Sequence, residues 1–342
     1  MKLIEGNWIF GNFNRLHRFV EEDGRQGLAV FDWDNTAVFG DIGDAFFRDQ
    51  VFRLDFRLTS REFEALIPET AYGIDTIDHA GGTISLPALK EALVAAYRRI
   101  ERHGFDREKI GMDPSYADFT AGLLALNRGL ETTVGIGCRF ANPWITRFLK
   151  GFSVNEIEKK AAAIFQRQRR MPIRDRRQTN ALGTLTVSWT EGIRVFPEMK
   201  NLMEAMRYRG FEIGVVTATN THIVSGAIEA ARYPVDRLVG QASETVADRL
   251  NGHPPPDFPA NYGAGKAENI RRFFKREPVF AAGDSDGDYE MLTEFPETEL
   301  RLVVHRGWSG RIQALHERAG DDGFLLQDVD PRTGKFIGGN EE

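Results

Sequence analysis

Two aspartates, separated by one residue, follow the first strongly apolar segment of the chain. Leu28–Phe31 is a short uninterrupted apolar run, as expected for a buried strand, and Asp32 and Asp34 come directly after it. Open α/β sheets bind their ligands at the carboxyl ends of strands, so two carboxylates there could do acid–base or metal chemistry. The alternative is an ordinary turn rich in Asp and Asn, since such turns are common.

Two further polar groups are predicted at the starts of later helices. Thr217 follows the apolar run Ile213–Val216, and its hydroxyl and the amides of the next helix could bind an anion. Alternatively, residues 217–220 only cap that helix. Lys266 lies in a glycine-containing loop, where a lone lysine is more often simply solvated, and this loop lacks the glycine spacing of a nucleotide-binding phosphate loop.

A run of alternating acidic residues follows a fourth predicted strand. It contains Asp284, Asp286 and Asp288. A calcium loop requires Gly at its sixth position and Glu at its twelfth, and these positions hold Tyr289 and Phe295. A magnesium site is still compatible with the run, because Mg²⁺ prefers one or two carboxylates and keeps several waters.

In this order, the four segments resemble the four motifs of the haloacid dehalogenase superfamily. The matching residues are Asp32-x-Asp34-x-Thr36, Thr217, Lys266 and Gly283-Asp284-Ser285-x-x-Asp288. The resemblance implies an α/β fold, with a Rossmann-like three-layer core around a parallel sheet. It also implies a mostly helical cap domain inserted after the first strand. Aspartate at position 34 is typical of the family's phosphatases and phosphotransferases, so the resemblance implies phosphate-ester chemistry.

The resemblance also implies roles for these residues. Asp32 would attack phosphorus and form an aspartyl-phosphate, and Asp34 would serve as general acid and then general base. Thr217 and Lys266 would hold the phosphate oxygens. The cofactor would be Mg²⁺, and its expected ligands are Asp32, the carbonyl of Asp34, Asp284 and Asp288.

The segment after the first motif bears on the substrate. Asp41 occupies the offset at which the phosphoserine phosphatase branch holds the substrate's ammonium group, and residues 40–44 resemble bacterial phosphorylcholine phosphatases. A small phosphate ester that carries an amine is therefore expected. The candidate substrate-binding residues are Asp41, Thr219 and Asn220, with Phe39, Trp144 and Trp189 as candidates for cation–π contact. Alternatively, Asp41 and Asp44 only begin a helix, and the aromatic residues belong to the core.

Hydrophobic spacing predicts where the supporting elements lie. The predicted strands are 28–31, 213–216, 237–240, 279–282 and 300–304, and the predicted helices are 7–22, 196–208, 221–231, 267–274, 289–294 and 309–317. Strands separated by helices predict a parallel sheet covered on both faces. The long insertion is predicted to be mostly helical, with helices at 86–103 and 153–170. The expected domains are a catalytic core of residues 1–45 and 189–342 and a cap of residues 46–188.

Composition narrows the class of protein. The 342 residues suggest about two domains, and 42% hydrophobic and 27% charged residues indicate a soluble globular protein. A net charge of −6 argues against a general nucleic-acid binder, and there is no apolar stretch of about 20 residues for a membrane span. No secretory signal is evident, so a cytoplasmic location is expected. The single Cys138 excludes an intramolecular disulfide. The sequence does not indicate an oligomeric state.

Residues 167–177 contain six arginines and one aspartate. This patch could steer anionic substrates or bind an acidic partner, or it could be a solvated helix end and loop. It suggests one alternative function, a phosphatase of a macromolecular substrate docked there, although a closed cap would exclude large substrates. A second alternative is a non-catalytic protein of the same fold that binds phospho-ligands, but the intact Asp32 and Asp34 argue against it.

Overall fold

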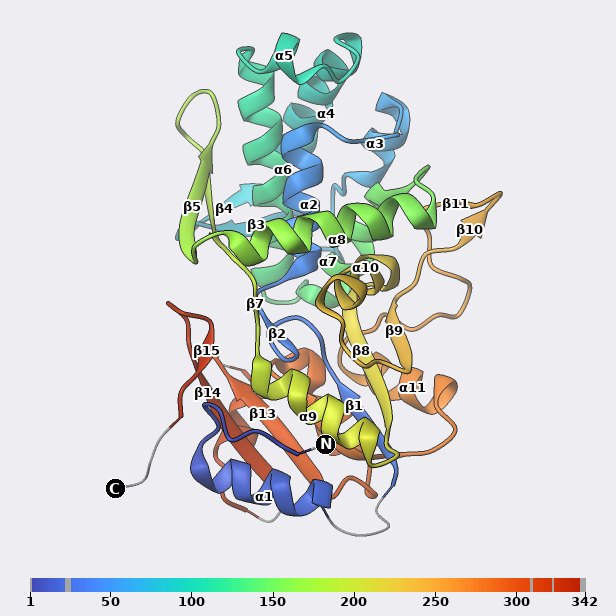
Figure 1. Cartoon of the computed structure of the whole chain (residues 1–342). Helices are drawn as coiled ribbons and strands as arrows, with labels where there is room; N and C mark the ends of the chain where they lie inside the picture. Colours follow the sequence, from blue (N-terminus) through green and yellow to red (C-terminus); the bar gives the residue numbers. More distant parts are fainter. Residues whose placement is uncertain (1, 22–25, 308–309, 322, 339–342) are drawn as a thin grey trace.

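A seven-stranded sheet forms the centre of one half of the molecule. The computed structural model describes residues 2–21, 26–307, 310–321 and 323–338 (Figure 1). The strand order is β15-β14-β13-β12-β1-β8-β9, and only the β14–β15 pair is antiparallel. The strands are β1 (Leu28–Phe31), β8 (Glu212–Asn220), β9 (Arg237–Gln241), β12 (Pro278–Gly283), β13 (Leu300–His305), β14 (Phe324–Asp330) and β15 (Lys335–Phe336).

Helices cover both faces of this sheet. Successive residues of a strand point to opposite faces, and in β1 Ala29 and Phe31 join one hydrophobic cluster while Leu28 and Val30 join another. The first cluster includes residues of α1 (Phe10–Glu21), α9 (Pro197–Tyr208) and α10 (Thr221–Ala231). The second includes residues of α11 (Ala264–Phe273), α12 (Tyr289–Thr293) and α13 (Gln313–His316). The predicted three-layer α/β fold is therefore confirmed.

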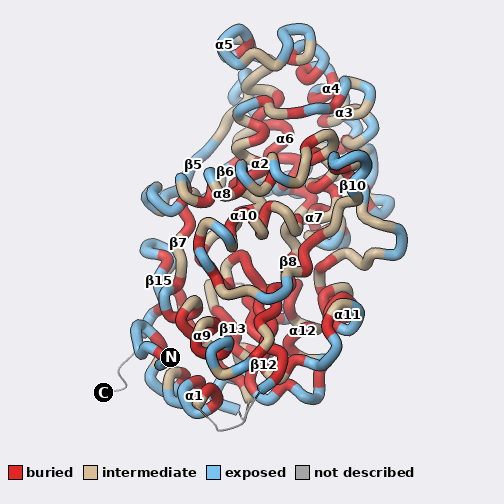
Figure 2. Tube along the Cα trace, turned by 45° about the vertical axis from the view of Figure 1, so that its right-hand side comes forward, coloured by how far each residue is buried: buried red, intermediate tan, exposed pale blue. Residues whose placement is uncertain are grey.

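The insertion between β1 and β8 builds a core of its own. Its elements are β2 (Val38–Phe39), α2 (Ile42–Arg53), α3 (Ser60–Leu66), β3 (Thr76–His79), β4 (Gly82–Ser85), α4 (Leu86–Arg102), α5 (Arg107–Ile110), α6 (Pro114–Thr132), α7 (Cys138–Thr146), η1 (Arg147–Leu149), α8 (Val154–Arg170), β5 (Arg174–Thr179), β6 (Thr186–Glu191) and β7 (Arg194–Val195). Its core is rich in aromatic rings, and Phe63 and Tyr97 stack with centroids 3.9 Å apart. Figure 2 shows buried residues continuing from the sheet into these helices. Within the described ranges, no helix has both the length and the apolarity to span a membrane.

Helix α8 lies across the junction of the two halves (Figure 1). Its residues Ile157, Ala161 and Phe165 belong to the cluster on the sheet rather than to the core of the insertion, and α8 packs against α10. Nearby, β2 pairs with β7, which joins the two ends of the insertion where they meet the sheet domain. These contacts tie the insertion to the core, and the predicted domain boundaries stay a prediction.

One alternative for residues 167–177, a solvated helix end and loop, is only partly right. Residues 167–170 end helix α8, but residues 174–177 begin strand β5, which forms an antiparallel hairpin with β6. Arg174 lies opposite Glu191, and Glu191 forms ion pairs with Arg174 and Arg176. The strand depends on a partner several residues away, so the local run of arginines could not indicate it. The other short elements are β10 (Thr245–Val246), β11 (Arg249–Leu250) and η2 (Asp286–Asp288).

The contact between α8 and α10 predicts a mutation-sensitive glycine. A Cβ at Gly226 would lie 2.2 Å from the carbonyl oxygen of Glu158, so Gly226→Ala should reduce the free energy of unfolding by about 1–3 kcal/mol. Gly11→Ala is the matched control, because a Cβ there meets nothing within 4 Å and alanine favours a helix by up to about 1 kcal/mol. Urea denaturation of both variants checks this, and equal stabilities would contradict the close packing.

Candidate active site

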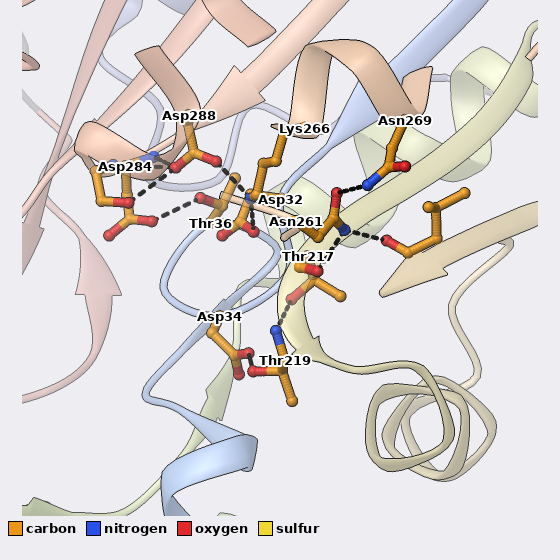
Figure 3. A network of polar contacts seen from close by, with 12 residues as sticks. Asp32, Asp34, Thr36, Thr217, Thr219, Asn261, Lys266, Asn269, Asp284 and Asp288 are labelled. Atoms are coloured by element: carbon orange, nitrogen blue, oxygen red, sulfur yellow. Dashed lines mark hydrogen bonds and ion pairs between the residues drawn. The ribbon is translucent and has the colours of Figure 1, made fainter. Parts of the chain in front are cut away.

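The candidate residues meet at one edge of the central sheet. Strand β1 lies between β8 and β12, and Phe31 pairs in register with Val215 on one side and Ala282 on the other. All three strands run in the same direction, so their carboxyl ends lie together. Figure 3 shows that Asp32, Thr217 and Asp284 converge there, although they are far apart in the sequence.

Three buried carboxylates gather around one buried lysine. Asp32, Asp284 and Asp288 each place a carboxylate oxygen within 4.8 Å of the other two. Lys266, which is 2% exposed, donates from Nζ to Oδ1 of Asp32 and to Oδ1 of Asp288, at 2.6 Å in both cases. No described residue donates a hydrogen bond to Oδ2 of Asp32. We refer to these four residues as the carboxylate–lysine cluster.

Burial and neighbouring charges shift the pKa of Asp32 and of Lys266. Burial raises the pKa of Asp32 well above its ordinary value; Lys266 opposes this shift, while Asp288 and Asp284 add to it. For Lys266, burial favours the neutral form, but the charges of Asp288 and Asp32 outweigh it and hold the pKa above its ordinary value. Lysine therefore stays charged and offsets only part of the negative charge.

Asp284 is held from two further elements. Its Oδ1 accepts a hydrogen bond from the Thr36 hydroxyl at 3.2 Å, and its Oδ2 accepts one from Nη2 of Arg306 at 2.7 Å. Burial raises the pKa of Asp284, and Arg306 partly counters the shift. Arg306 lies just after β13 and was not among the sequence candidates, since one arginine after a strand forms no recognisable pattern.

The loop after β12 closes on Asp288. Oδ2 of Asp288 accepts hydrogen bonds from the backbone amides of Asp284 and Ser285 and from the Ser285 hydroxyl, each at 3.1 Å. A Cβ at Gly283 would lie 2.4 Å from Cβ of Asp288, so only glycine permits this approach. Asp288 therefore holds its own loop with one oxygen and Lys266 with the other.

The side chain of Asp34 points away from this cluster (Figure 3). Its Oδ1 accepts from the amide of Ile42 and its Oδ2 from the Thr219 hydroxyl, both at 2.7 Å. Burial raises the pKa of Asp34 well above its ordinary value, and the charge of Asp41 adds to the shift. The carboxyl of Asp34 therefore lies apart from those of Asp32, Asp284 and Asp288, and its raised pKa favours the protonated form. Metal binding by its carbonyl stays a prediction.

A buried amide network lies behind Thr217, which is 1% exposed. Nδ2 of Asn261 donates to the carbonyl of Thr217 at 2.6 Å and to that of Val239 at 2.8 Å, and Asn269 of α11 donates to Asn261 at 3.1 Å. The network ties β8 and β9 to the helix that carries Lys266. Asn261 and Asn269 were not among the sequence candidates, because an isolated asparagine gives no local signal.

The three candidate substrate-binding residues line one pocket, but two of them also cap helices. Asp41 accepts from the amide of Asp44 at 2.8 Å and caps α2, while Asn220 accepts from the amide of His222 at 3.0 Å and caps α10. The pocket also includes Thr219. Burial raises the pKa of Asp41 to about 7, with the charge of Asp44 adding to the shift.

The aromatic candidates lie elsewhere. Phe39 is buried against the sheet, Trp144 is buried in the core of the insertion, and Trp189 packs against that core. The pocket is instead lined by Phe46 and Phe47 of α2, which sequence spacing did not single out.

A family model described as haloacid dehalogenase-like hydrolase matches residues 118–293, more than half of the chain. The chain belongs to this family. The resemblance inferred from the four motifs is thus confirmed at the level of the family. A search of curated proteins found no match.

Solved structures are also similar to the chain. A conserved protein of unknown function from Anaerococcus prevotii DSM 20548 superposes with a TM-score of 0.85 at 22% identity, covering all of both chains, and therefore shares the fold. A protein of unknown function from Bordetella pertussis Tohama I has a TM-score of 0.47 at 14% identity, over 90% of this chain and 99% of that one. A probable phosphoserine phosphatase from Vibrio cholerae has a TM-score of 0.39 at 12% identity, over 85% and 58%.

The amide network predicts a large effect of Asn261→Ala. The change leaves the buried carbonyls of Thr217 and Val239 without their donor, and each such loss costs roughly 1–3 kcal/mol, so the free energy of unfolding should fall by about 2–4 kcal/mol. Asn14→Ala, at an exposed position of α1, should be neutral or slightly stabilising. Urea denaturation measures both, and a loss below about 1 kcal/mol for Asn261→Ala would contradict the role of the network.

Proposed function

We propose that the protein is a Mg²⁺-dependent phosphomonoester hydrolase that works through an aspartyl-phosphate on Asp32. The observation that carries the proposal is the convergence of Asp32, Asp284 and Asp288 around Lys266, with Asp34 on a separate side. Family membership supports hydrolysis, and the separation of the carboxyls supports two distinct roles for Asp32 and Asp34. The substrate class is a small phosphate ester that carries an amine.

The donor set fits a divalent cation. Three buried carboxylates are paired with only two cations, Lys266 and Arg306, so a negative charge is left that a metal ion would offset, and Mg²⁺ prefers carboxylate oxygen as a ligand. Asp32, Asp284 and the carbonyl of Asp34 would hold the ion, with Asp288 as a further donor. Bound there, Mg²⁺ supplies positive charge against the anionic phosphate and favours the ionised form of the nucleophile.

Asp32 acts as the nucleophile. Its carboxylate attacks phosphorus, a new P–O bond forms and the bond to the alcohol oxygen breaks. The hydrogen bond from Lys266 to Oδ1 orients the carboxylate and favours its ionised form, which opposes part of the effect of burial on its pKa. Lys266 and the Thr217 hydroxyl would hold the phosphate oxygens, whose charge is spread in the transition state.

Asp34 acts first as the general acid and then as the general base. Its raised pKa favours a protonated carboxyl, which can give its proton to the departing alcohol oxygen. The resulting carboxylate then takes a proton from the water that attacks the aspartyl-phosphate. The amide of Ile42 and the Thr219 hydroxyl fix the direction of this side chain throughout.

The insertion, residues 46–188, acts as a cap in this proposal. Its residues Phe47, Glu131 and Thr146 line the same pocket as Thr219 of the core, so cap and core together would surround the alcohol part of the substrate. Because the cap would contact the part of the substrate that differs from one ester to the next, it would determine which phosphate ester binds.

The two aspartates predict different kinetic defects. With p-nitrophenyl phosphate, Asp32→Asn should lower kcat by on the order of 10⁴-fold or more, because it removes the nucleophile. Asp34→Asn should lower kcat by on the order of 10²–10⁴-fold. The p-nitrophenolate ion leaves without help from an acid, so the second step suffers most and a covalent phosphoenzyme should accumulate in Asp34→Asn. Phosphate release and intact-protein mass spectrometry test this, and full turnover by Asp32→Asn would exclude the mechanism.

The carboxylate cluster predicts stabilisation by Mg²⁺. A ligand that binds only the folded state stabilises it by about 2.7 kcal/mol at a concentration a hundredfold above Kd, so MgCl₂ should raise Tm. Asp284→Asn should abolish most of this increase. Asp321→Asn, at a side chain that is 61% exposed, should leave it intact. Thermal unfolding with and without MgCl₂ measures the effect, and an equal increase in all three proteins would place the ion elsewhere.

A further inference from the structure

The backbones of Asp32 and Asp34 are held in different ways. Asp32 continues strand β1, and its amide donates to the carbonyl of Ala282 on β12 at 2.9 Å. Asp34 lies beyond the strand, in a turn that is closed by a hydrogen bond from the amide of Ala37 to the carbonyl of Trp33, also at 2.9 Å. The sheet therefore sets the place of Asp32, whereas the place of Asp34 depends on this turn.

The turn, residues 33–38, has an uncommon backbone conformation. Asn35 has a φ of 66°, in the left-handed region, and its Oδ1 accepts a hydrogen bond from the amide of Gly40 at 2.9 Å. A residue other than glycine keeps such a conformation only where the surrounding structure imposes it. The contacts that hold this turn therefore also determine where the carboxyl of Asp34 lies.

The side chain of Trp33 attaches the start of the turn to the hydrophobic core. Trp33 is fully buried, and its ring packs against that of Tyr233, with centroids 5.0 Å apart and planes at 73°. On α8, the ring of Phe165 lies 6.5 Å from the same indole. No described residue accepts a hydrogen bond from Nε1 of Trp33. The indole is therefore held by packing, and the neighbouring rings determine where it lies.

Tyr233 also contacts the end of the turn. Its hydroxyl donates to the carbonyl of Ala37 at 2.6 Å, and both residues are buried. Burial raises the pKa of the Tyr233 phenol above its ordinary value, so the hydroxyl keeps its proton and stays a donor around neutral pH. One side chain thus holds the turn at two points, with its ring at Trp33 and its hydroxyl at Ala37.

Helix α10 places Tyr233 relative to Asp34. The amide of Tyr233 donates to the carbonyl of Ile228 at 3.2 Å, which fixes the residue to the end of the helix. The helix begins directly after β8, the strand that carries Thr219, and the Thr219 hydroxyl donates to Oδ2 of Asp34. Asp34 is thus held from both ends of α10, at its carboxyl by Thr219 and at its turn by Tyr233.

We propose that Tyr233 is a positioning residue for Asp34, which keeps the turn in place for the two proton transfers. The inference rests on the proposed function, in which Asp34 is the general acid and then the general base. Proton transfer requires the two heavy atoms to approach within hydrogen-bond distance, and a displacement of about 1 Å can cost a large factor in rate. Attack by Asp32, which the sheet holds, depends much less on the turn.

Tyr233→Phe tests the proposal, because it keeps the ring against Trp33 and removes only the hydroxyl from Ala37. Tyr97→Phe is the matched control. The buried hydroxyl of Tyr97 donates to the carbonyl of Leu58 at 2.8 Å, in the core of the insertion. Each change removes the donor from a buried carbonyl, so both should lower Tm to a similar, small extent while the protein stays folded.

Only Tyr233→Phe should show the kinetics of a displaced acid and base. With p-nitrophenyl phosphate, whose leaving group needs no acid, kcat should fall about tenfold as dephosphorylation becomes slow, and kcat/KM should stay within about twofold. A covalent phosphoenzyme should then accumulate. With phenyl phosphate, whose leaving group has a pKa of about 10, kcat/KM should also fall about tenfold. Tyr97→Phe should keep the wild-type values for both esters.

Steady-state kinetics and intact-protein mass spectrometry of the full chain separate the outcomes. A merely structural role of Tyr233 would reduce the amount of active protein, so kcat and kcat/KM would fall together for both esters without a phosphoenzyme. That result, or wild-type kinetics in Tyr233→Phe, would overturn the inference and leave the phosphatase function standing. If the wild-type protein hydrolyses no phosphate ester, the proposed function is wrong and the inference falls with it.

Discussion

The structure depends on keeping several negative charges together in a place that water hardly reaches. Asp32, Asp284 and Asp288 are each buried and lie within a few ångströms of one another, and burial together with repulsion from the neighbouring carboxylates raises the pKa of Asp32 and of Asp284. A protonated Asp32 would be a poor nucleophile. Lys266 offsets part of this negative charge, because it donates short hydrogen bonds to two of the three carboxylates, Asp32 and Asp288. A divalent cation is the natural complement, since lysine alone leaves the cluster negative.

The fold supplies this arrangement through strand order. Asp32 and the loop that carries Asp284 follow β1 and β12, which are adjacent and parallel, so residues about 250 positions apart reach the same edge. The lysine must approach from α11, and the buried asparagines of that region hold α11 to β8 and β9. Burial of a charged lysine is tolerated only where such positioning is accurate, because a misplaced charge in the interior is costly.

The sequence could predict those features of the fold and the site that depend on residues close together in the chain. Strand ends, the two-residue spacing of Asp32 and Asp34, and the run from Gly283 to Asp288 all have sequence signatures, and the alternation of strands and helices predicted the layered fold. Arg306, Asn261 and Glu131 could not be predicted in this way. Each is a single residue whose importance arises only from what the folded chain places beside it. The β5–β6 hairpin was missed for the same reason, because a strand of arginines requires a partner strand.

The two hydrogen bonds that Asp34 accepts turn its carboxyl away from the carboxylate–lysine cluster, and in the proposed function this is the side of the departing alcohol. The central claim is that phosphorus is first transferred to Asp32 and then to water. The stereochemistry at phosphorus tests this most directly, with a phosphomonoester made chiral by oxygen isotopes. Two successive in-line displacements predict retention of configuration in the product. Inversion would mean that water attacks the substrate directly and would contradict the account.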